Sequence, residues 1–579
     1  MKNQELAQLL FEIGEFLELQ EIPFKPQAYQ QAALALDNLE EDILDIYKKD
    51  GLKGLKNIPA VGESIALKIE EYLKTGKIKY YEQLKKSTPV EVDELTKIEG
   101  LGAKRIKKLY KELGIRTVKD LERAVAEHKV ASLSGFGEKM EKNIAEAIGF
   151  LKKSKGRFLL KEILNDVERI EDKFRKMKGV EKVSAAGSVR RRKETVGDAD
   201  FLVSIKDASD KYLVEKIMKA FVSMEGVVKI VSKGETRSSV KTRPGLDMDL
   251  RLVPSSSFGA ALQYFTGSKE HNIALRKIAI KQGYKLNEYG LFRKDRKIKG
   301  ETEEEIYEKL GLDWMSPEIR ENAGEIEAAQ ERKLPKLIEL KDVKGDFHCH
   351  SDWDGGDNSI EDMVKQAKGL GYEYLGISDH TQFLRIENGL DKKRLMEQNR
   401  YIKKLNEKLA GFKVLHGAEV NILNDGSLDI NEETLKKLDY VCVGVHSNFK
   451  MPEKEMTERI IRAMKKPYVN ILNHPTGRIL QRREGFNVDM EKIFRAARQH
   501  NVILEINSSE RADLSAEHAR RAKEYGVKLV IGTDSHDKHQ MANMKFGVYQ
   551  ARRGWLEKKD VVNAYSLEKL KDYFTFLKS

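Results

Sequence analysis

One pattern in the second half of the chain restricts the possible folds more than any other feature. A short apolar run, a polar residue at its end and room for one helix recur seven times from Gly345 onward. Such alternation places the strands parallel, and this many units form a barrel rather than an open sheet. The runs end near His350, His380, Glu419, His446, His474, Asn507 and Asp534.

The histidines follow the same pattern. Ten of the twelve lie after residue 340, and DFHCHSD would place His348 and His350 on one face of a strand with Cys349 turned away. Barrel strands converge at their C-terminal ends, so these imidazoles and carboxylates should meet at one mouth. They suit two or three ions of Zn²⁺, Mn²⁺ or Fe²⁺, bridged by Glu419, that activate water against a phosphoester. A single H-x-H would more often be an ordinary structural feature.

Composition limits the class of protein. A chain of 579 residues needs about three to five domains. The net charge of +12 suits a polyanion such as nucleic acid, although a solvated lysine surface is the alternative. Cys349 and Cys442 cannot build a disulfide framework and are expected to be packed thiols, which fits the cytoplasm. We expect no signal peptide, no transit peptide and no membrane span.

A short theme occurs three times within residues 1–150, which otherwise show helical periodicity. The copies IPAVGESIALKI, IEGLGAKRIKKL and LSGFGEKMEKNI each combine an apolar residue, a glycine turn and a helix start. One such turn is usually a helix corner, but three favour binding of DNA phosphates by backbone N–H groups. The pattern resembles the helix–hairpin–helix motif, although Ala60 replaces its usual glycine. The predicted DNA contacts are Gly62, Gly100, Gly102, Lys104, Arg105, Gly135 and Gly137.

The stretch GSVRRRKETVGDADFLV (187–203) holds three arginines beside two aspartates. If GDADFLV is a strand, Asp198 and Asp200 share one face, and LDMDLRLV offers a second strand with Asp247 and Asp249 on one face. Converging carboxylates need cations, and oxygen ligands suit Mg²⁺. Two ions about 3.5–4 Å apart would support in-line displacement at phosphorus. A surface D-x-D beside an ion-pair cluster is the alternative.

At these residues the sequence resembles the family X DNA polymerases. GSVRRRKETVGDADFLV, SKGETR, DLRLV and YFTGSKEHNIALR are similar to that family's palm and fingers motifs, and the resemblance covers residues 1 to about 318. It implies that Asp198, Asp200 and Asp249 bind Mg²⁺ or Mn²⁺. Asp249 is preferred over Asp247 because the family's third aspartate precedes a hydrophobic residue and an arginine.

The same resemblance implies a nucleotide site. Ser188 and Arg191 would contact the triphosphate, and Tyr264 and Phe265 would lie beside the sugar and the primer end. Asn272 and Arg276 would approach the minor-groove side of the nascent pair and the template. The full set of implied nucleotide contacts is Gly187, Ser188, Arg191, Gly197, Tyr264, Phe265, Gly267, Asn272 and Arg276.

Residues 1–85 resemble the N-terminal domain of this family, which binds the 5′-phosphate of a gap and in some members opens abasic sugars through a lysine Schiff base. ESIALKI places Lys68 at that lysine's position, and FKPQAYQQAA supplies Lys25 and Tyr29 as DNA contacts. A Schiff-base lysine must be partly neutral, so its pKa should be lowered. Phosphate binding without lyase activity is the alternative.

Residues 343–579 resemble the polymerase-and-histidinol-phosphatase (PHP) domain, a distorted seven-stranded metal-dependent barrel. No histidine ligand is replaced, which implies an active phosphoesterase. The turn SDWDGGDN has glycine where that family usually has aspartate, and Asp354 is the expected substitute. Asn507 and Arg511 would touch substrate phosphate. The implied ligands are His348, His350, Asp354, His380, Glu419, His446, His474, Asp534 and His536.

The predicted protein is therefore multidomain: helical N-terminal helix–hairpin–helix domains, an α+β nucleotidyltransferase palm with fingers, and a distorted (β/α)7 PHP barrel. The expected boundaries are 1–85 for the 5′-phosphate-binding or lyase-like domain, 86–153 for the helix–hairpin–helix subdomain, 154–255 for the palm, 256–318 for the fingers, 319–342 for a linker and 343–579 for the PHP domain.

The resemblance implies a monomeric DNA repair polymerase that fills short gaps from dNTPs on gapped or primer–template DNA. The PHP half would be a 3′–5′ exonuclease, with removal of 3′-phosphates or cleavage at abasic sites as further activities. One alternative is a nucleotidyltransferase acting on RNA or a small molecule, since D-x-D palms are widely shared. Another is a DNA-docking scaffold with degenerate centres. The hairpins and YFTGS argue against the first, and the intact acids and histidines against the second.

Overall fold

The computed structural model describes residues 2–19, 22, 25–37, 39, 43–87, 90–95, 98, 101–154, 156–206, 210–243, 245–571 and 573–574. The chain divides into two compact units, one of Met1–Lys155 with Gln481–Arg483 and the other of Gly156–Leu480 with Glu484–Ser579. Within the described ranges, no helix has the length and apolar character needed to cross a membrane.

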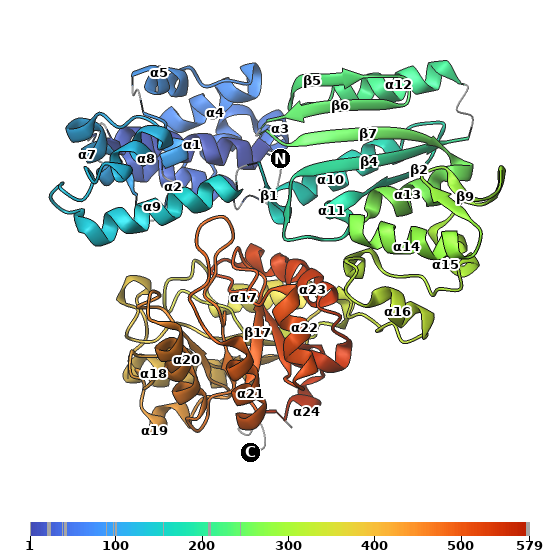
Figure 1. The fold of residues 1–579 in the computed structure, drawn as a ribbon. Coiled ribbons are helices and arrows are strands. Elements are labelled where there is room, and N and C mark those ends of the chain that lie inside the picture. The colour runs from blue at the N-terminus through green and yellow to red at the C-terminus, as the bar shows by residue number, and fades with distance from the viewer. Residues whose placement is uncertain are drawn as a thin grey trace. The chain divides into compact units, whose positions relative to one another are not determined.

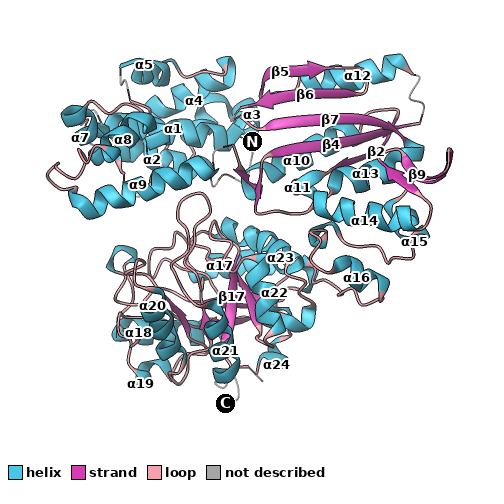
Figure 2. Ribbon diagram, viewed as in Figure 1, coloured by secondary structure: helices cyan, strands magenta, loops and turns pink. Residues whose placement is uncertain are grey.

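The first unit is helical, as predicted (Figures 1 and 2). Leu6, Leu10, Ile13 and Leu17 lie at helical spacing along its first helix and are fully buried, so one apolar stripe holds that helix in the core. The helices are α1 (Lys2–Leu19), α2 (Lys25–Asp37), α3 (Ile43–Lys56), α4 (Glu63–Thr75), α5 (Lys79–Ser87), α6 (Val92–Leu95), α7 (Ala103–Leu113), α8 (Val118–Ala126) and α9 (Gly137–Ser154).

The second unit begins with a five-stranded sheet in the order β2-β4-β7-β6-β5, in which β4 and β7 are parallel and the other neighbours antiparallel. Both predicted acidic strands are confirmed. The elements are β1 (Phe158–Leu159), α10 (Leu160–Arg175), β2 (Val180–Ala185), α11 (Gly187–Arg190), β3 (Thr195–Val196), β4 (Asp198–Ile205), α12 (Lys211–Val222), β5 (Val227–Lys233), β6 (Arg237–Thr242) and β7 (Asp247–Pro254).

A mixed segment follows the sheet, as its sequence predicts. It contains α13 (Phe258–Thr266), α14 (Lys269–Lys281), β8 (Lys285–Asn287), β9 (Gly290–Arg293), β10 (Arg296–Lys299) and α15 (Glu303–Lys309). The strands β8, β9 and β10 form a small antiparallel sheet of their own.

Part of the stretch 319–342, expected to be a linker, is folded against this segment and includes α16 (Glu325–Gln330). Arg320 is fully buried and its guanidinium donates to both carboxylate oxygens of Glu303, at 2.6 and 3.1 Å. Glu325, also buried, lies 2.7 Å from Nδ1 of His271. The sequence predicts a linker here because this stretch is rich in charged residues. Charged residues can nevertheless be buried when each acid is hydrogen-bonded to a basic group.

The predicted barrel is confirmed. Its strands are all parallel and form two sheets, β11-β12-β13 and β14-β15-β16-β17-β18. Isolated parallel bridges, His380 to Glu419 and Cys349 to Ser535, join these sheets beyond the regular strand ends. The strands are β11 (Gly345–Asp346), β12 (Tyr374–Ile377), β13 (Lys413–His416), β14 (Glu419–Asn421), β15 (Cys442–Gly444), β16 (Ile471–Leu472), β17 (Ile503–Asn507) and β18 (Leu529–Gly532).

One predicted strand of the barrel, the run that ends at Glu419, is divided into β13 and β14. Both cysteines are buried free thiols, as expected. The barrel helices are α17 (Ile360–Gly369), α18 (Lys392–Asn406), α19 (Glu432–Leu435), α20 (Glu453–Met464), α21 (Met490–His500), α22 (Ala516–Glu524), α23 (Met544–Arg553) and α24 (Leu567–Leu570).

Candidate active sites

Four aspartates lie side by side on β4 and β7. The parallel register sets Asp198 opposite Asp247 and Asp200 opposite Asp249. The residues between them along each strand are buried, so the carboxylates share the face turned away from the apolar core. Burial, with the charges of Asp198 and Asp249, raises the pKa of Asp200 to about 6. Crowding of this kind favours a bound cation.

Asp249 is paired with an arginine in this arrangement. Its Oδ2 lies 2.8 Å from Nη2 of Arg237, while Asp247 lies 2.8 Å from Nζ of Lys241. Among the described residues, the groups whose ligand atoms all lie within 4.8 Å of one another include no palm aspartate. The fold therefore brings the predicted carboxylates to one face but leaves Asp249 turned toward Arg237.

Gly187 opens α11 directly beside these acids. Its φ is +59°, and a β-carbon there would lie 3.0 Å from Oδ2 of Asp200. Gly267 has φ +70°, and its β-carbon would lie 3.1 Å from Nη1 of Arg191. Arg191 donates to the carbonyl oxygen of Thr266 and, at 3.1 Å, to Glu321. The two predicted glycine turns, on α11 and after α13, are thus held together through Arg191, whereas Ser188 lies within α11 and Gly197 directly precedes β4.

The aromatic pair predicted to face the nucleotide lies at the end of α13. The rings of Tyr264 and Phe265 pack edge to face, with centres 5.1 Å apart, and the guanidinium of Arg251 lies 4.4 Å from the ring centre of Phe265. Asn272 donates to the carbonyl oxygen of Tyr264 at 2.7 Å, which fixes α14 against α13. Arg276, half-buried, is one turn further along α14.

A buried network beside this site is absent from the sequence predictions. The carboxylate of Glu303 accepts from Arg190 at 2.8 and 2.7 Å and from Arg320, so one glutamate serves two arginines. Burial alone would raise the pKa of Glu303, but the two guanidinium groups hold it well below its usual value. Arg190 ends α11, so this network fixes the turn next to the aspartates. No local pattern could reveal it, because 113 residues separate Arg190 from Glu303.

The three glycine turns of the first unit share one backbone hydrogen bond. The N–H of Val61, Leu101 and Phe136 donates to the carbonyl three residues earlier, at 3.1, 3.0 and 3.0 Å. Ala60 adopts φ +58°, a region rare for residues with a β-carbon, and the equivalent Gly135 has φ +85°. Gly62 and Gly102 precede α4 and α7, Gly137 begins α9, and Lys104 and Arg105 are exposed, whereas Gly100 lies outside the described residues.

Lys68 projects from α4 into a small polar cluster. Its Nζ donates to the carbonyl and hydroxyl oxygens of Ser64, at 3.1 and 3.0 Å, and lies 5.9 Å from the ring centre of Tyr29 and 4.9 Å from that of Tyr80. Burial, and then the charge of Lys25, lowers the pKa of the Lys68 amine. This shift has the direction that the sequence predicts for a nucleophilic lysine.

In the barrel, the predicted ligands surround Glu419. Its Oε1 lies 2.8 Å from His474 and 3.5 Å from His446, and its Oε2 lies 3.1 Å from His380. The same Oε2 lies 3.3 Å from His348 and 3.7 Å from His350. The ring of His536 stacks on that of His350, with centres 4.1 Å apart. The convergence expected of strand ends in a barrel is thus present.

The donor atoms of this cluster fit bound metal ions. Nε2 of His350, Nδ1 of His380, Nε2 of His446 and Oε2 of Glu419 are buried without a hydrogen-bond partner. Buried polar atoms in that state are costly unless an ion completes them. Four groups have ligand atoms within 4.8 Å of one another: His350, His380 and His536; His348, His350 and Glu419; His380, Glu419 and His446; and His350, Asp354 and Asp379.

Asp354 is arranged as a hydrogen-bond partner of the ligands. Its Oδ2 lies 2.8 Å from Nδ1 of His350 and accepts from the N–H of His380 at 2.8 Å, while Oδ1 accepts from Gly356. The carboxylate therefore turns Nε2 of His350 toward Glu419, which is how an outer carboxylate orients a ligating imidazole.

Glu505 has a similar role and is absent from the sequence predictions. Its Oε1 lies 2.6 Å from Nδ1 of His348, and its Oε2 accepts from the N–H of His474 at 2.7 Å. Burial would lower the pKa of His348, but Glu505, Asp534 and Glu419 hold it well above its usual value. Glu505 lies two residues before Asn507 on β17 and therefore on the same strand face. This spacing could have predicted from the sequence that Glu505 faces the site.

Asn507 and Arg511 both contact Asp534. Nδ2 of Asn507 and Nε of Arg511 lie 3.1 and 3.2 Å from its Oδ2. Asp534 and His474 have φ values of +54° and +30°. Rare backbone conformations of this kind gather at functional sites, where the surrounding structure imposes them.

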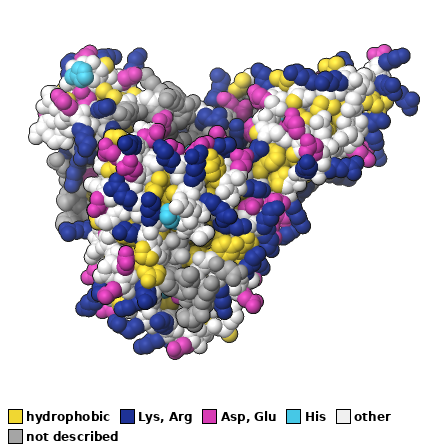
Figure 3. Space-filling model, turned by 60° about the horizontal axis from the view of Figure 1, so that its bottom comes forward, with side chains coloured by type: hydrophobic (Ala, Val, Ile, Leu, Met, Phe, Trp, Pro, Cys, Tyr) yellow, Lys and Arg dark blue, Asp and Glu magenta, His cyan; other side chains and the backbone are white. Residues whose placement is uncertain are grey.

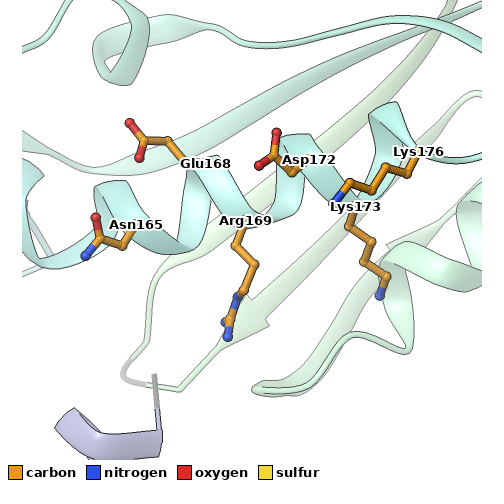
Figure 4. Close-up of a pocket in the computed structure, with 6 residues that line it drawn as sticks. All are labelled: Asn165, Glu168, Arg169, Asp172, Lys173 and Lys176. Atoms are coloured by element: carbon orange, nitrogen blue, oxygen red, sulfur yellow. The ribbon is translucent and has the colours of Figure 1, made fainter. Parts of the chain in front are cut away.

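Lys and Arg side chains are scattered among acidic and apolar ones over the face in Figure 3. An open hollow on α10 contains no predicted residue (Figure 4). Its Arg169 pairs with Asp166 at 2.9 Å. Its lining residues are Asn165, Glu168, Arg169, Asp172, Lys173 and Lys176.

The fold and the two sites define a class: a nucleotidyltransferase palm joined to a PHP phosphoesterase barrel. Family models agree, with a helix–hairpin–helix domain over residues 1–78, a tandem of such motifs over 52–113 and 92–149, a DNA polymerase beta thumb over 261–321 and a PHP domain over 346–509. The thumb match falls on the segment that the sequence motifs associate with fingers.

The DNA polymerase/3′–5′ exonuclease PolX of Bacillus subtilis is 37% identical over 584 residues, which cover 100% of both chains. The chain therefore belongs to the PolX family, as its motifs predict. Probable phosphatases of Thermoanaerobacter and Acetivibrio thermocellus are 33% and 31% identical, over 30% and 33% of this chain and 72% and 78% of their own. Family membership and the histidine clusters imply dependence on divalent metal ions, and the helix–hairpin–helix and thumb domains imply DNA binding.

Proposed function

We propose that this chain is a DNA repair polymerase that fills short gaps from dNTPs and trims 3′ ends with its PHP barrel as a 3′–5′ exonuclease. The observation that carries the proposal is the register of β4 and β7, which aligns Asp200 with Asp249 on the face that also bears Asp198. Full-length likeness to a PolX enzyme supports it. We also propose that the chain acts as a monomer in the cytoplasm.

In the polymerase half, Asp198, Asp200 and Asp249 would hold Mg²⁺ or Mn²⁺. Bound there, the ions would lower the pKa of the primer hydroxyl and neutralise charge on the triphosphate. Ser188 and Arg191 would bind the triphosphate, with Arg191 exchanging Glu321 for a phosphate oxygen. The Tyr264–Phe265 pair would support the sugar, and Gly197, Gly267, Asn272 and Arg276 would complete the nucleotide site.

The first unit would hold the DNA. Lys104 and Arg105 are exposed at the start of α7, directly after the glycine turn. The backbone N–H groups at such a helix start can bind a DNA phosphate without reading the bases. Lys25 and Tyr29 would contact the 5′ side of a gap. The lowered pKa of Lys68 supports Schiff-base chemistry at an abasic sugar, in which its neutral amine attacks the aldehyde carbon and the carbonyl oxygen leaves as water.

In the barrel, the histidines with Glu419, Asp534 and Asp354 would hold or orient two or three ions of Mn²⁺, Zn²⁺ or Fe²⁺. Such ions supply an activated water at neutral pH and a counter-charge for the phosphate. Arg511 and Asn507 would bind and orient the phosphate of the terminal nucleotide. Likeness to probable phosphatases supports removal of 3′-phosphates as a second activity at this site, and abasic-site cleavage would use the same chemistry.

A gapped duplex with a labelled primer, incubated with dNTPs and Mg²⁺ or Mn²⁺, tests the proposal. We expect template-directed extension that stops when the gap is filled. Extension of RNA or a small molecule in place of the primer would favour a different nucleotidyltransferase. DNA binding without any extension or trimming would favour a scaffold.

A further inference from the structure

The palm and the barrel, both in the second unit, contact each other, and the carboxylate of Glu194 accepts three hydrogen bonds across this contact. Glu194, between α11 and β3, accepts from Nη1 and Nη2 of Arg478 at 3.1 and 3.0 Å and from Nε2 of Gln550. All three donors belong to the barrel. The side chains of Glu194 and Arg478 are 25% and 19% exposed, so solvent screens this bidentate pair less than a surface pair.

Two further contacts flank this pair. The guanidinium of Arg192 lies 4.7 Å from the ring centre of Tyr549, and Nζ of Lys161 lies 3.1 Å from Oε1 of Glu510. The palm loop therefore contacts the barrel through Arg192 and Glu194, and Lys161 on α10 adds a third contact.

On the barrel side, Arg478 reaches the loop that follows β17. Its Nε and Nη2 donate to the carbonyl oxygen of Ala512, with Nε at 3.1 Å. Ala512 has φ +44°, a conformation that residues with a β-carbon rarely adopt without outside support. Its neighbour Arg511 donates to Asp534. The guanidinium of Arg478 thus spans from the palm carboxylate to the residue adjoining Arg511.

The same loop is tied to the segment that follows His474. The carboxylate of Asp513 accepts from the N–H of Thr476 and Gly477, at 2.9 and 2.8 Å. The segments 474–478 and 507–513 are therefore joined by hydrogen bonds, and Arg478 links them to the palm.

We propose that Glu194 is a positioning residue for the nuclease, supplied by the polymerase half. It holds Arg478 against Ala512 and so keeps Arg511 and Asn507 aimed at the substrate phosphate. This inference rests on the proposed exonuclease function. Without Glu194, the half-buried guanidinium of Arg478 would lose its carboxylate partner. It would then turn toward water and give up its hydrogen bonds to the carbonyl oxygen of Ala512.

The test compares full-length Glu194→Ala, the more conservative Glu194→Gln, Arg478→Gln and the double variant Glu194→Ala/Arg478→Gln. Hydrogen–deuterium exchange should become faster in peptides that cover 507–513, without a change in the palm strands. Exonuclease kcat/KM should fall about tenfold in Glu194→Ala and less in Glu194→Gln, with gap filling within about twofold. The double variant should lose no more than either single one, because both break one link.

The matched control is Glu168, an exposed glutamate on α10 of the palm. Glu168→Ala should change neither hydrogen–deuterium exchange nor either activity. Unchanged exchange at 507–513 in Glu194→Ala would overturn the inference, as would equal losses of both activities with a lowered melting temperature. Absence of exonuclease in the wild type would instead contradict the proposed function, and the exchange experiment would still decide the role of Glu194.

Discussion

A β-carbon on residue 187 would lie 3.0 Å from Oδ2 of Asp200, so any other residue at this turn would press on the Asp200 carboxylate. The φ of +59° at Gly187 adds a second requirement for glycine. The turn that would bind the triphosphate is thereby fixed directly against the acid that would bind the metal.

Gly187→Ala should therefore shift the Asp200 carboxylate by a few tenths of an ångström and lower gap filling by about tenfold, less than the roughly 100-fold loss that a displacement near 1 Å can cause. Exonuclease activity should be unchanged. Gly226→Ala is the matched control, since Gly226 also has positive φ in the palm but open space around its β-carbon. Equal losses in the two variants would show that strain alone, and not the contact with Asp200, is responsible.

Arg237 should compete with metal for Asp249, because its Nη2 lies 2.8 Å from the carboxylate. Arg237→Ala should lower the Mg²⁺ concentration for half-maximal gap filling by up to about fivefold, the range of a partly exposed ion pair. Lys241→Ala removes the partner of Asp247 and should leave the Mg²⁺ requirement unchanged. The opposite result in a Mg²⁺ titration would make Asp247 the ligand.

Removing metal should destabilise the barrel as well as stop trimming, because the buried nitrogens around Glu419 lose their partner. Adding Mn²⁺ at about 100 times its dissociation constant should stabilise the chelator-treated protein by about 2.7 kcal/mol, measured by calorimetry. His350→Ala should abolish this gain, whereas His518→Gln, away from the cluster on α22, should retain it. A gain that survives in His350→Ala would place the ion elsewhere.

The surroundings of Lys68 predict how Schiff-base formation depends on pH. Burial and the charge of Lys25 lower the pKa of Lys68 and so increase the fraction of neutral amine. Lys25→Ala removes one cause, so the pKa of Lys68 should rise and borohydride trapping of an abasic substrate should shift to higher pH. Lys53→Ala, exposed on α3, should not shift the profile. Trapping that persists in Lys68→Ala would contradict the assignment of the nucleophile.

Local patterns allowed much of this structure to be predicted. Alternation along DADFLV and DMDLRLV fixed which side chains share a face, and strand ends in the second half located His348, His380 and His474. Period-two alternation and βα repetition depend on neighbouring residues, so a single sequence contains them. The glycine turns are equally local, which is why three turns with the same backbone hydrogen bond could be expected.

Contacts between distant residues could not be predicted in this way. Glu303, Arg320 and Glu325 look like surface charges in the sequence, and only the fold shows that Glu303 pairs with Arg320 and Glu325 with His271 in its interior. The same holds for Glu505 behind His348 and for Glu194 against Arg478. The approach of Arg237 to Asp249 also depends on the pairing of β6 with β7, which no motif specifies.

The most direct test of two separate metal-dependent sites uses one gapped duplex whose primer is labelled so that extension and shortening are both visible. With dNTPs and Mn²⁺, Asp249→Ala should shorten the primer without extending it, and His350→Ala should extend it without shortening it. If Asp249→Ala still fills the gap, or if one substitution removes both activities, the assignment of synthesis to the β4–β7 acids and trimming to the barrel is contradicted.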